Sequence, residues 1–224
     1  MSRRYLFLLA AAVITVVVLG FFFEITGLIS YGLIVISVWL TMGILAAWFL
    51  ALGFRKIRLI KCSFSLKTTL KLPLLLFLTG ITGITFMNFY APIALPSTTL
   101  PVSQQLAYMY ETDQGDRFAL RFRTLKERDR QRLQQTMVLY EQGLIETPED
   151  QYRAAMIFQH GTEVEHYELA YLLAKQASES GVAEADGLWQ DAYDRWMLAQ
   201  GKPQRYGTQT TATFTIWGIS FEQQ

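Results

Sequence analysis

Three long apolar blocks fill most of the first 96 residues, and they constrain the fold of this 224-residue chain more than any other feature. They cover residues 5–23, 28–52 and 72–95. An α-helix rises 1.5 Å per residue, so about 20 apolar residues cross a hydrocarbon core of about 30 Å. Each block is close to or above that length. The sequence therefore predicts a membrane domain over residues 1–96 with three transmembrane helices.

The lysines and arginines of this half predict how the chain crosses the membrane. Arg3 and Arg4 precede the first block, and the 54–71 loop is rich in cations, whereas the 24–31 connection has none. Short cytoplasmic loops carry the excess of lysine and arginine. We therefore expect a multi-pass protein of a bacterial inner membrane. The N-terminus and the 54–71 loop are then cytoplasmic, and residues 97–224 form a periplasmic or extracellular domain. The cationic loop acts either as a plain topological anchor or as a segment that lies along the anionic lipid surface.

The composition of the apolar blocks argues against transport. Apart from Glu24 at a helix end, they contain almost no ionisable side chains, which a proton or ion pathway normally needs. Gly80 and Gly83 give the third block a small-residue face, which either packs within the three-helix unit or docks a partner subunit. The net charge of +1 argues against nucleic-acid binding. The expected partners are the lipid bilayer and another membrane or envelope protein.

Residues 97–224 predict an all-α domain of α-hairpin-like helices after a short proline-containing linker. Helices are expected over 103–111, 121–142, 148–159, 162–180 and 183–200, with alanine-rich faces that pack closely. Thr147 before Pro148 is a typical helix start, and Thr162 with Glu165 suggests a capping box. The alternating charges of residues 126–132 predict a solvated helix face. The alternating pattern of residues 210–221, around Trp217, predicts a short strand or hairpin.

Four polar groups stand out near the expected helix ends of this domain. They are Asp113-Gln114 with Arg117, Gln159-His160, Asp194-Arg195, and the run from Gln204 through Tyr206 and Thr208 to Gln209. In this order, over residues 105–209, they resemble a bacterial family of uncharacterised domains with the pattern DQxxR, QH, DR and QxYGTQ. The membrane half lies outside the resemblance. The family has no established activity, so the resemblance implies a candidate site without a function.

These residues allow three interpretations. They form a structural network, because arginine–aspartate pairs and glutamines commonly tie helix ends and turns together. Alternatively they line a ligand pocket, in which Arg195 holds a carboxylate such as Asp113 or Asp194 and Gly207 allows a tight turn that aims Thr208 and Gln209 inward. In the third interpretation His160 is a general base or acid.

Two functions follow from these interpretations. The first is a membrane-anchored interaction or accessory subunit that presents a helical domain outside the cytoplasm. The alternative is a membrane-tethered, hydrolase-like enzyme whose polar site includes His160, Asp194 and Arg195. The two histidines and nearby glutamates match no standard metal motif, so no metal site is predicted. The sequence identifies neither a cofactor nor a substrate.

Overall fold

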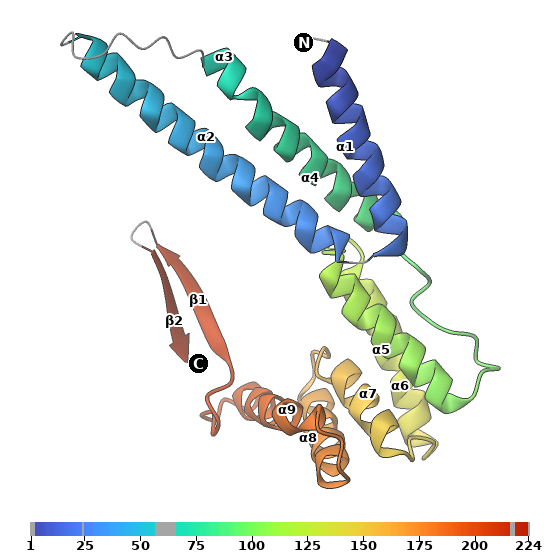
Figure 1. Cartoon of the computed structure of the whole chain (residues 1–224). Coiled ribbons are helices and arrows are strands. Elements are labelled where there is room, and N and C mark those ends of the chain that lie inside the picture. The colour runs from blue at the N-terminus through green and yellow to red at the C-terminus, as the bar shows by residue number, and fades with distance from the viewer. Residues whose placement is uncertain (1–2, 24, 57–65, 216–217, 224) are drawn as a thin grey trace. The chain divides into compact units, whose positions relative to one another are not determined.

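The structure is a computed structural model that describes residues 3–23, 25–56, 66–215 and 218–223. In these ranges the chain is helical, as the sequence predicts, and it ends in a two-stranded hairpin (Figure 1). The chain divides into two compact units. The first comprises Met1–Ala91 and Gly115–Thr124, and the second comprises Pro92–Gln114 and Leu125–Gln224.

The first unit is built from the apolar blocks. Its helices are α1 (Arg3–Phe22), α2 (Thr26–Lys56), the short α3 (Leu66–Thr69) and α4 (Lys71–Phe89). Helix α4 contacts both α1 and α2. It ends at Phe89, before the predicted residue 95, because Pro92 lacks a backbone N–H and disfavours helical geometry in the residue before it. Residues 57–65, half of the cationic 54–71 loop, lie outside the described residues.

Two helices of the described chain are long and apolar enough to cross a membrane. They are Thr26–Leu52 and Leu66–Phe89. The first predicted crossing, residues 5–23, is not among them, because the apolar stretch of α1, Arg4–Gly20, is shorter. At 1.5 Å per residue it reaches about 25 Å, which is less than a hydrocarbon core of about 30 Å. Length and composition therefore support two spans.

The small residues of α4 are used for packing inside this unit. A Cβ atom on Gly80 would lie 2.5 Å from the backbone oxygen of Ser30 and 2.7 Å from Cγ1 of Ile34, both in α2. A Cβ atom on Gly83 would lie 2.7 Å from Cγ1 of Val16 in α1. The two glycines thus allow close helix contacts. Of the two roles that the sequence leaves open, packing within the unit is the one observed.

The segment Gly115–Thr124 joins the first unit, although the sequence assigned it to the second domain. Arg121 donates hydrogen bonds from Nε to the carbonyl of Met87 (3.1 Å) and from Nη1 to Oδ1 of Asp116 (3.0 Å), and both charged side chains are buried. Asn88 donates to the carbonyl of Leu120 at 2.9 Å. These contacts attach the segment to the end of α4.

Among its described residues, the second unit has five consecutive helices around one core. They are α5 (Val102–Phe118, of which the end belongs to the first unit), α6 (Leu125–Glu141), α7 (Pro148–Phe158), α8 (Val164–Glu179) and α9 (Ala185–Ala199). Helix α8 contacts both α7 and α9. The predicted alanine faces are confirmed by full burial of Ala154, Ala155, Ala170, Ala174, Ala177 and Ala192.

Several predicted helix boundaries are corrected. Helix α5 continues beyond residue 111, and α6 begins at Leu125 rather than at residue 121. The intervening turn is closed by a hydrogen bond from the backbone N–H of Arg121 to the carbonyl of Asp116, with Leu120 at φ 53°. A helix cannot pass through that left-handed residue.

The two predicted helix starts have different outcomes. The Thr147 side chain accepts a hydrogen bond from the backbone N–H of Asp150 at 3.2 Å, which confirms the predicted start of α7. The start of α8 lies one residue later than predicted. Its N-cap is Glu163, whose N–H donates to Nδ1 of His166 at 3.2 Å. His166 therefore takes part in the start of this helix.

The tail forms the predicted hairpin. Strands β1 (Thr210–Thr215) and β2 (Gly218–Gln223) pair antiparallel, with Thr213 opposite Ser220. Trp217, around which the pattern was centred, lies outside the described residues.

Candidate functional site

Asp194 organises the segment that follows α9. Its side chain is fully buried and accepts hydrogen bonds from the backbone N–H groups of Arg205 (2.8 Å), Tyr206 (3.0 Å) and Thr208 (2.9 Å), and from the Thr208 hydroxyl (2.9 Å). Gly207, at φ 68°, makes the turn in this segment, as predicted. All four donors converge on one carboxylate, which is how a charged side chain holds a loop closed.

These donors also shift the acidity of Asp194. Burial alone would raise the pKa of its carboxyl group, because burial disfavours the charged form. The three backbone N–H groups and the Thr208 hydroxyl oppose that effect, and together they hold the pKa of Asp194 below its ordinary value. The carboxylate is thus ionised at neutral pH and already engaged, so its role is to position the segment.

Arg195 ties the same segment to the end of α7. Its Nη1 donates to the carbonyl of Gln159 and its Nε donates to Oε1 of Gln209, both at 3.1 Å. Gln204 and Gln209 bind each other: Nε2 of Gln204 donates to the carbonyl of Gln209 (2.6 Å), and the N–H of Gln209 donates to Oε1 of Gln204 (2.8 Å). The guanidinium therefore binds neutral amide oxygens here.

Asp113 lies at the other side of the Gln159-His160 pair. It is buried, and its Oδ1 lies 3.3 Å from Nδ1 of His160 and 3.7 Å from Nε of Arg132. Its Oδ2 accepts a hydrogen bond from Gln114 at 2.9 Å. The His160 side chain is 17% exposed. A carboxylate beside one imidazole nitrogen can orient the ring and leave the other nitrogen for chemistry.

The structure brings most of the predicted site residues into two linked networks. Gln159 and His160 join them, because one binds Arg195 through its carbonyl and the other lies against Asp113. Arg117 belongs to the first compact unit. Tyr206 contributes its backbone N–H to Asp194, and the residue as a whole is 37% exposed.

Arg132 lies beside Asp113 in the candidate site, and the sequence did not predict this position. The charged run 126–132 was expected to be solvated, but Arg128 and Arg132 are buried, and Arg132 donates to Asp129 at 2.7 Å. Only part of the run fits the prediction, as in the exposed pair of Glu127 and Arg130. The spacing of Arg128, Arg132 and Thr136 could have predicted this burial. The three residues are four positions apart, so they lie on one face of the helix.

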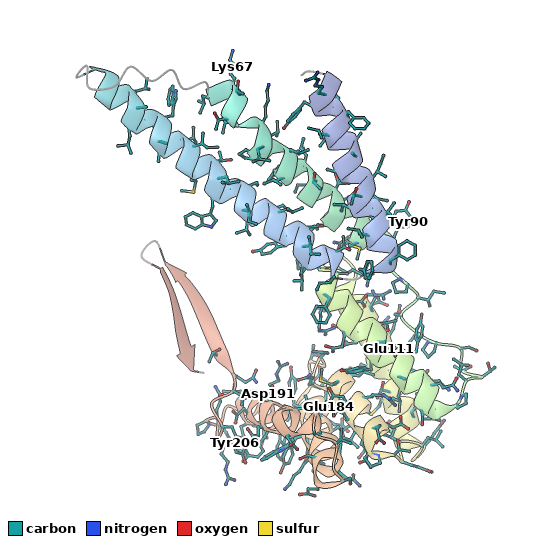
Figure 2. The ribbon with its side chains drawn as sticks, in the orientation of Figure 1. Lys67, Tyr90, Glu111, Glu184, Asp191 and Tyr206 are labelled. Atoms are coloured by element: carbon teal, nitrogen blue, oxygen red, sulfur yellow. The ribbon has the colours of Figure 1, made fainter. Side chains whose placement is uncertain are left out.

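A second group of residues, which we call the aromatic cluster, was also missed. It consists of Tyr171 on α8, Trp189, Tyr193 and Trp196 on α9, and Tyr206 in the segment between α9 and β1 (labelled in Figure 2). Ring centroids are 5.1 Å apart between Trp189 and Tyr206, 5.6 Å between Tyr193 and Tyr206, and 5.6 Å between Tyr171 and Trp196.

The rings of the aromatic cluster are all partly exposed. Tyrosine and tryptophan combine a large apolar surface with a polar tip. They therefore suit surfaces that contact water in the free protein and are buried in a complex. The i, i+4, i+7 spacing of Trp189, Tyr193 and Trp196 could have indicated one helix face in advance. Trp189 and Tyr171 also pack against the hydrophobic core of the second unit.

The described residues contain no group of three or more histidine, cysteine, aspartate or glutamate side chains arranged to hold a metal ion. Comparison of the chain with models of protein families, with curated proteins and with solved structures finds no match.

Proposed function

We propose that this chain is a membrane-anchored interaction subunit of a bacterial inner membrane, which presents its second unit outside the cytoplasm to another membrane or envelope protein. The observation that carries the proposal is the aromatic cluster. Protein interfaces concentrate their binding energy in a few tryptophan, tyrosine and arginine side chains. The edge-to-face contacts of Tyr193 with Tyr206 and Tyr171 hold these rings in place before binding, which lowers the entropy lost on association.

The polar networks support the same proposal. Asp194 and Arg195 form hydrogen bonds with other groups of the same chain. Asp194 binds the backbone N–H of Tyr206 and holds this residue beside α9, and Arg195 binds the carbonyl of Gln159. In this proposal the polar residues are the scaffold of the binding surface rather than the surface itself. The polar residues that carry the resemblance to the uncharacterised family then keep the segment after α9 in its conformation. The partner contacts the neighbouring rings.

Co-purification in mild detergent, quantified by mass spectrometry, tests this function. Trp196→Leu and Tyr193→Leu remove rings but keep apolar volume, so we expect a partner captured by the unmodified chain to fall at least about tenfold. Phe122→Ala is the control, because Phe122 is an exposed ring outside the cluster. Equal capture by the three variants and the unmodified chain would exclude the aromatic cluster as the binding surface.

One observation favours a second candidate, a membrane-tethered hydrolase in which His160 is the general base. That observation is the 3.3 Å approach of Asp113 to Nδ1 of His160. Asp194 would have no chemical role in it, since its oxygens hold the 205–208 segment. The test is turnover of ester, phosphodiester and peptide substrates by the full chain. Activity that is lost in His160→Gln and kept in His166→Gln would establish this function.

A further inference from the structure

We propose that the aromatic cluster binds an acidic segment of the partner protein. This inference rests on the proposed function and concerns the chemistry of the partner. Cations border the rings at both ends of the cluster. The Arg205 guanidinium lies 5.6 Å from the ring centroid of Tyr206, and the Lys175 ammonium lies 5.8 Å from that of Tyr171.

A third cation, Lys202, lies just after the C-terminal end of α9, the helix that carries Trp196. Gln200 donates from Nε2 to the carbonyl of Trp196 at 3.1 Å, and Lys202 donates to Oε1 of Gln200 at 2.7 Å. The side chain of Lys202 is therefore held near the C-terminal end of α9. Lys175 and Arg205 thus place positive charge against rings of the cluster, and Lys202 adds a third charge at the end of α9. Carboxylates are the complementary groups.

These cations are available to a partner. In the part of the chain that the structure describes, Lys202 and Arg205 form no ion pair within 4.0 Å. Lys175 lies 4.0 Å from Glu179, with both side chains well exposed (43% and 68%). A pair with that separation and exposure contributes little and exchanges easily. An incoming carboxylate can replace it without leaving a buried charge.

The rings and the cations together define what fits. Apolar side chains or prolines of an extended segment can cover the tyrosine and tryptophan rings, while its carboxylates pair with the three cations. Binding of this kind is steered by charge and weakens as salt increases. The cluster contains two tryptophans and three tyrosines, residues that also favour membrane interfaces, so a lipid surface is the competing occupant.

The test uses the full chain in nanodiscs of phosphatidylcholine and labelled peptides of about 12 residues. One peptide repeats Glu-Pro-Leu, and matched peptides carry Lys or Gln in place of Glu. We expect the Glu peptide to bind at least about tenfold more tightly than the other two, and raising the salt from about 0.05 to 0.5 M should weaken that binding. Equal binding of the three peptides, or no binding of the Glu peptide, overturns the proposal.

Charge reversal gives the second arm. Arg205→Glu and Lys175→Glu should each reduce binding of the Glu peptide by about tenfold. Lys126→Glu, an exposed lysine on α6, is the control and should change it less than about twofold. Nanodiscs with about 30% phosphatidylglycerol test whether the cluster binds a lipid surface instead of a peptide. The quenching arm uses a chain in which Trp39, Trp48 and Trp217 are replaced by Phe, because Trp39 and Trp48 lie in α2, a candidate membrane span. Loss of peptide binding in these nanodiscs, with Trp189 and Trp196 quenched by brominated phosphatidylglycerol, would assign the cluster to lipid and overturn the proposal.

Failure of this inference can be told apart from failure of the proposed function. If partner capture falls in Trp196→Leu but is unchanged in Arg205→Glu and Lys175→Glu, the surface binds a partner that is not acidic. If capture is unchanged in Trp196→Leu and Tyr193→Leu, the proposed function itself fails.

Discussion

At the scale of single residues, Asp194 has the clearest consequence for stability. Asp194→Asn replaces one acceptor oxygen with an NH2 group that faces backbone donors, so we expect the free energy of unfolding to fall by about 2–4 kcal/mol. Thermal melting of the full chain in neutral detergent measures the change. Asp191→Asn is the matched control, since Asp191 is half-exposed and should change stability by less than about 0.5 kcal/mol. Similar losses in both variants would contradict the role assigned to Asp194.

The lowered pKa of Asp194 predicts a response to acid. Because the folded pKa lies below the unfolded value of about 3.9, the stabilisation is complete above that pH and is lost as pH falls through the folded pKa. Denaturant midpoints measured from pH 6 to pH 2 should fall more steeply for the unmodified chain than for Asp194→Asn. Parallel curves would mean that Asp194 does not contribute to this dependence.

The sequence was informative about some of these residues and silent about others. It marked Asp194 in one polar group and Thr208 in the next, the run from Gln204 to Gln209, and the structure joins the two groups. It did not predict Arg132 as the arginine near Asp113, because the charged neighbours of Arg132 concealed its buried helix position. A pairing between α5 and α6 depends on how the helices pack, which local spacing does not determine.

At the scale of elements, the packing of α4 makes a paired prediction for two glycines. Gly83→Ala would place a Cβ atom 2.7 Å from Val16 and 2.8 Å from Cβ of Ser30, so we expect about 1–3 kcal/mol of destabilisation. Gly43→Ala, on α2, meets nothing within 4 Å and should be neutral or stabilise by up to about 1 kcal/mol. Unfolding in detergent with a steric-trap or denaturant assay measures both. A result in which Gly43→Ala costs as much as Gly83→Ala would contradict this packing.

Helix existence was easier to predict than helix boundaries. Thr147 before Pro148 placed the start of α7 correctly, because the signal is local. The start of α6 was missed by four residues, because residues 115–124 fold against α4, far away in the sequence. Local sequence signals cannot report such a contact. The same reason explains why a helix was expected through Arg121.

At the scale of the whole molecule, the sides of the membrane on which the two termini lie distinguish two transmembrane helices from three. If only α2 and α4 cross the membrane, the N-terminus and the C-terminus lie on the same side. If α1 also crosses, they lie on opposite sides. The cations of the 54–71 loop favour a cytoplasmic loop in both cases, so we expect residues 97–224 outside. Reporters fused before Met1 and after Gln224 measure both ends. A reporter that is active in the cytoplasm when fused after Gln224 would contradict the proposed orientation.

The attachment of Gly115–Thr124 to the first unit also has a consequence for biosynthesis. The apolar helices leave the ribosome first, but their unit remains incomplete until Thr124 has followed. At 5–20 residues per second, the roughly 30 residues after Ala91 require about 2–6 s. During that interval the end of α4 lacks Arg121 and Leu120, which later bind the Met87 carbonyl and the Asn88 side chain. Until residues 115–124 have been added, the Met87 carbonyl and the Asn88 side chain therefore lack the partners that they have in the complete unit.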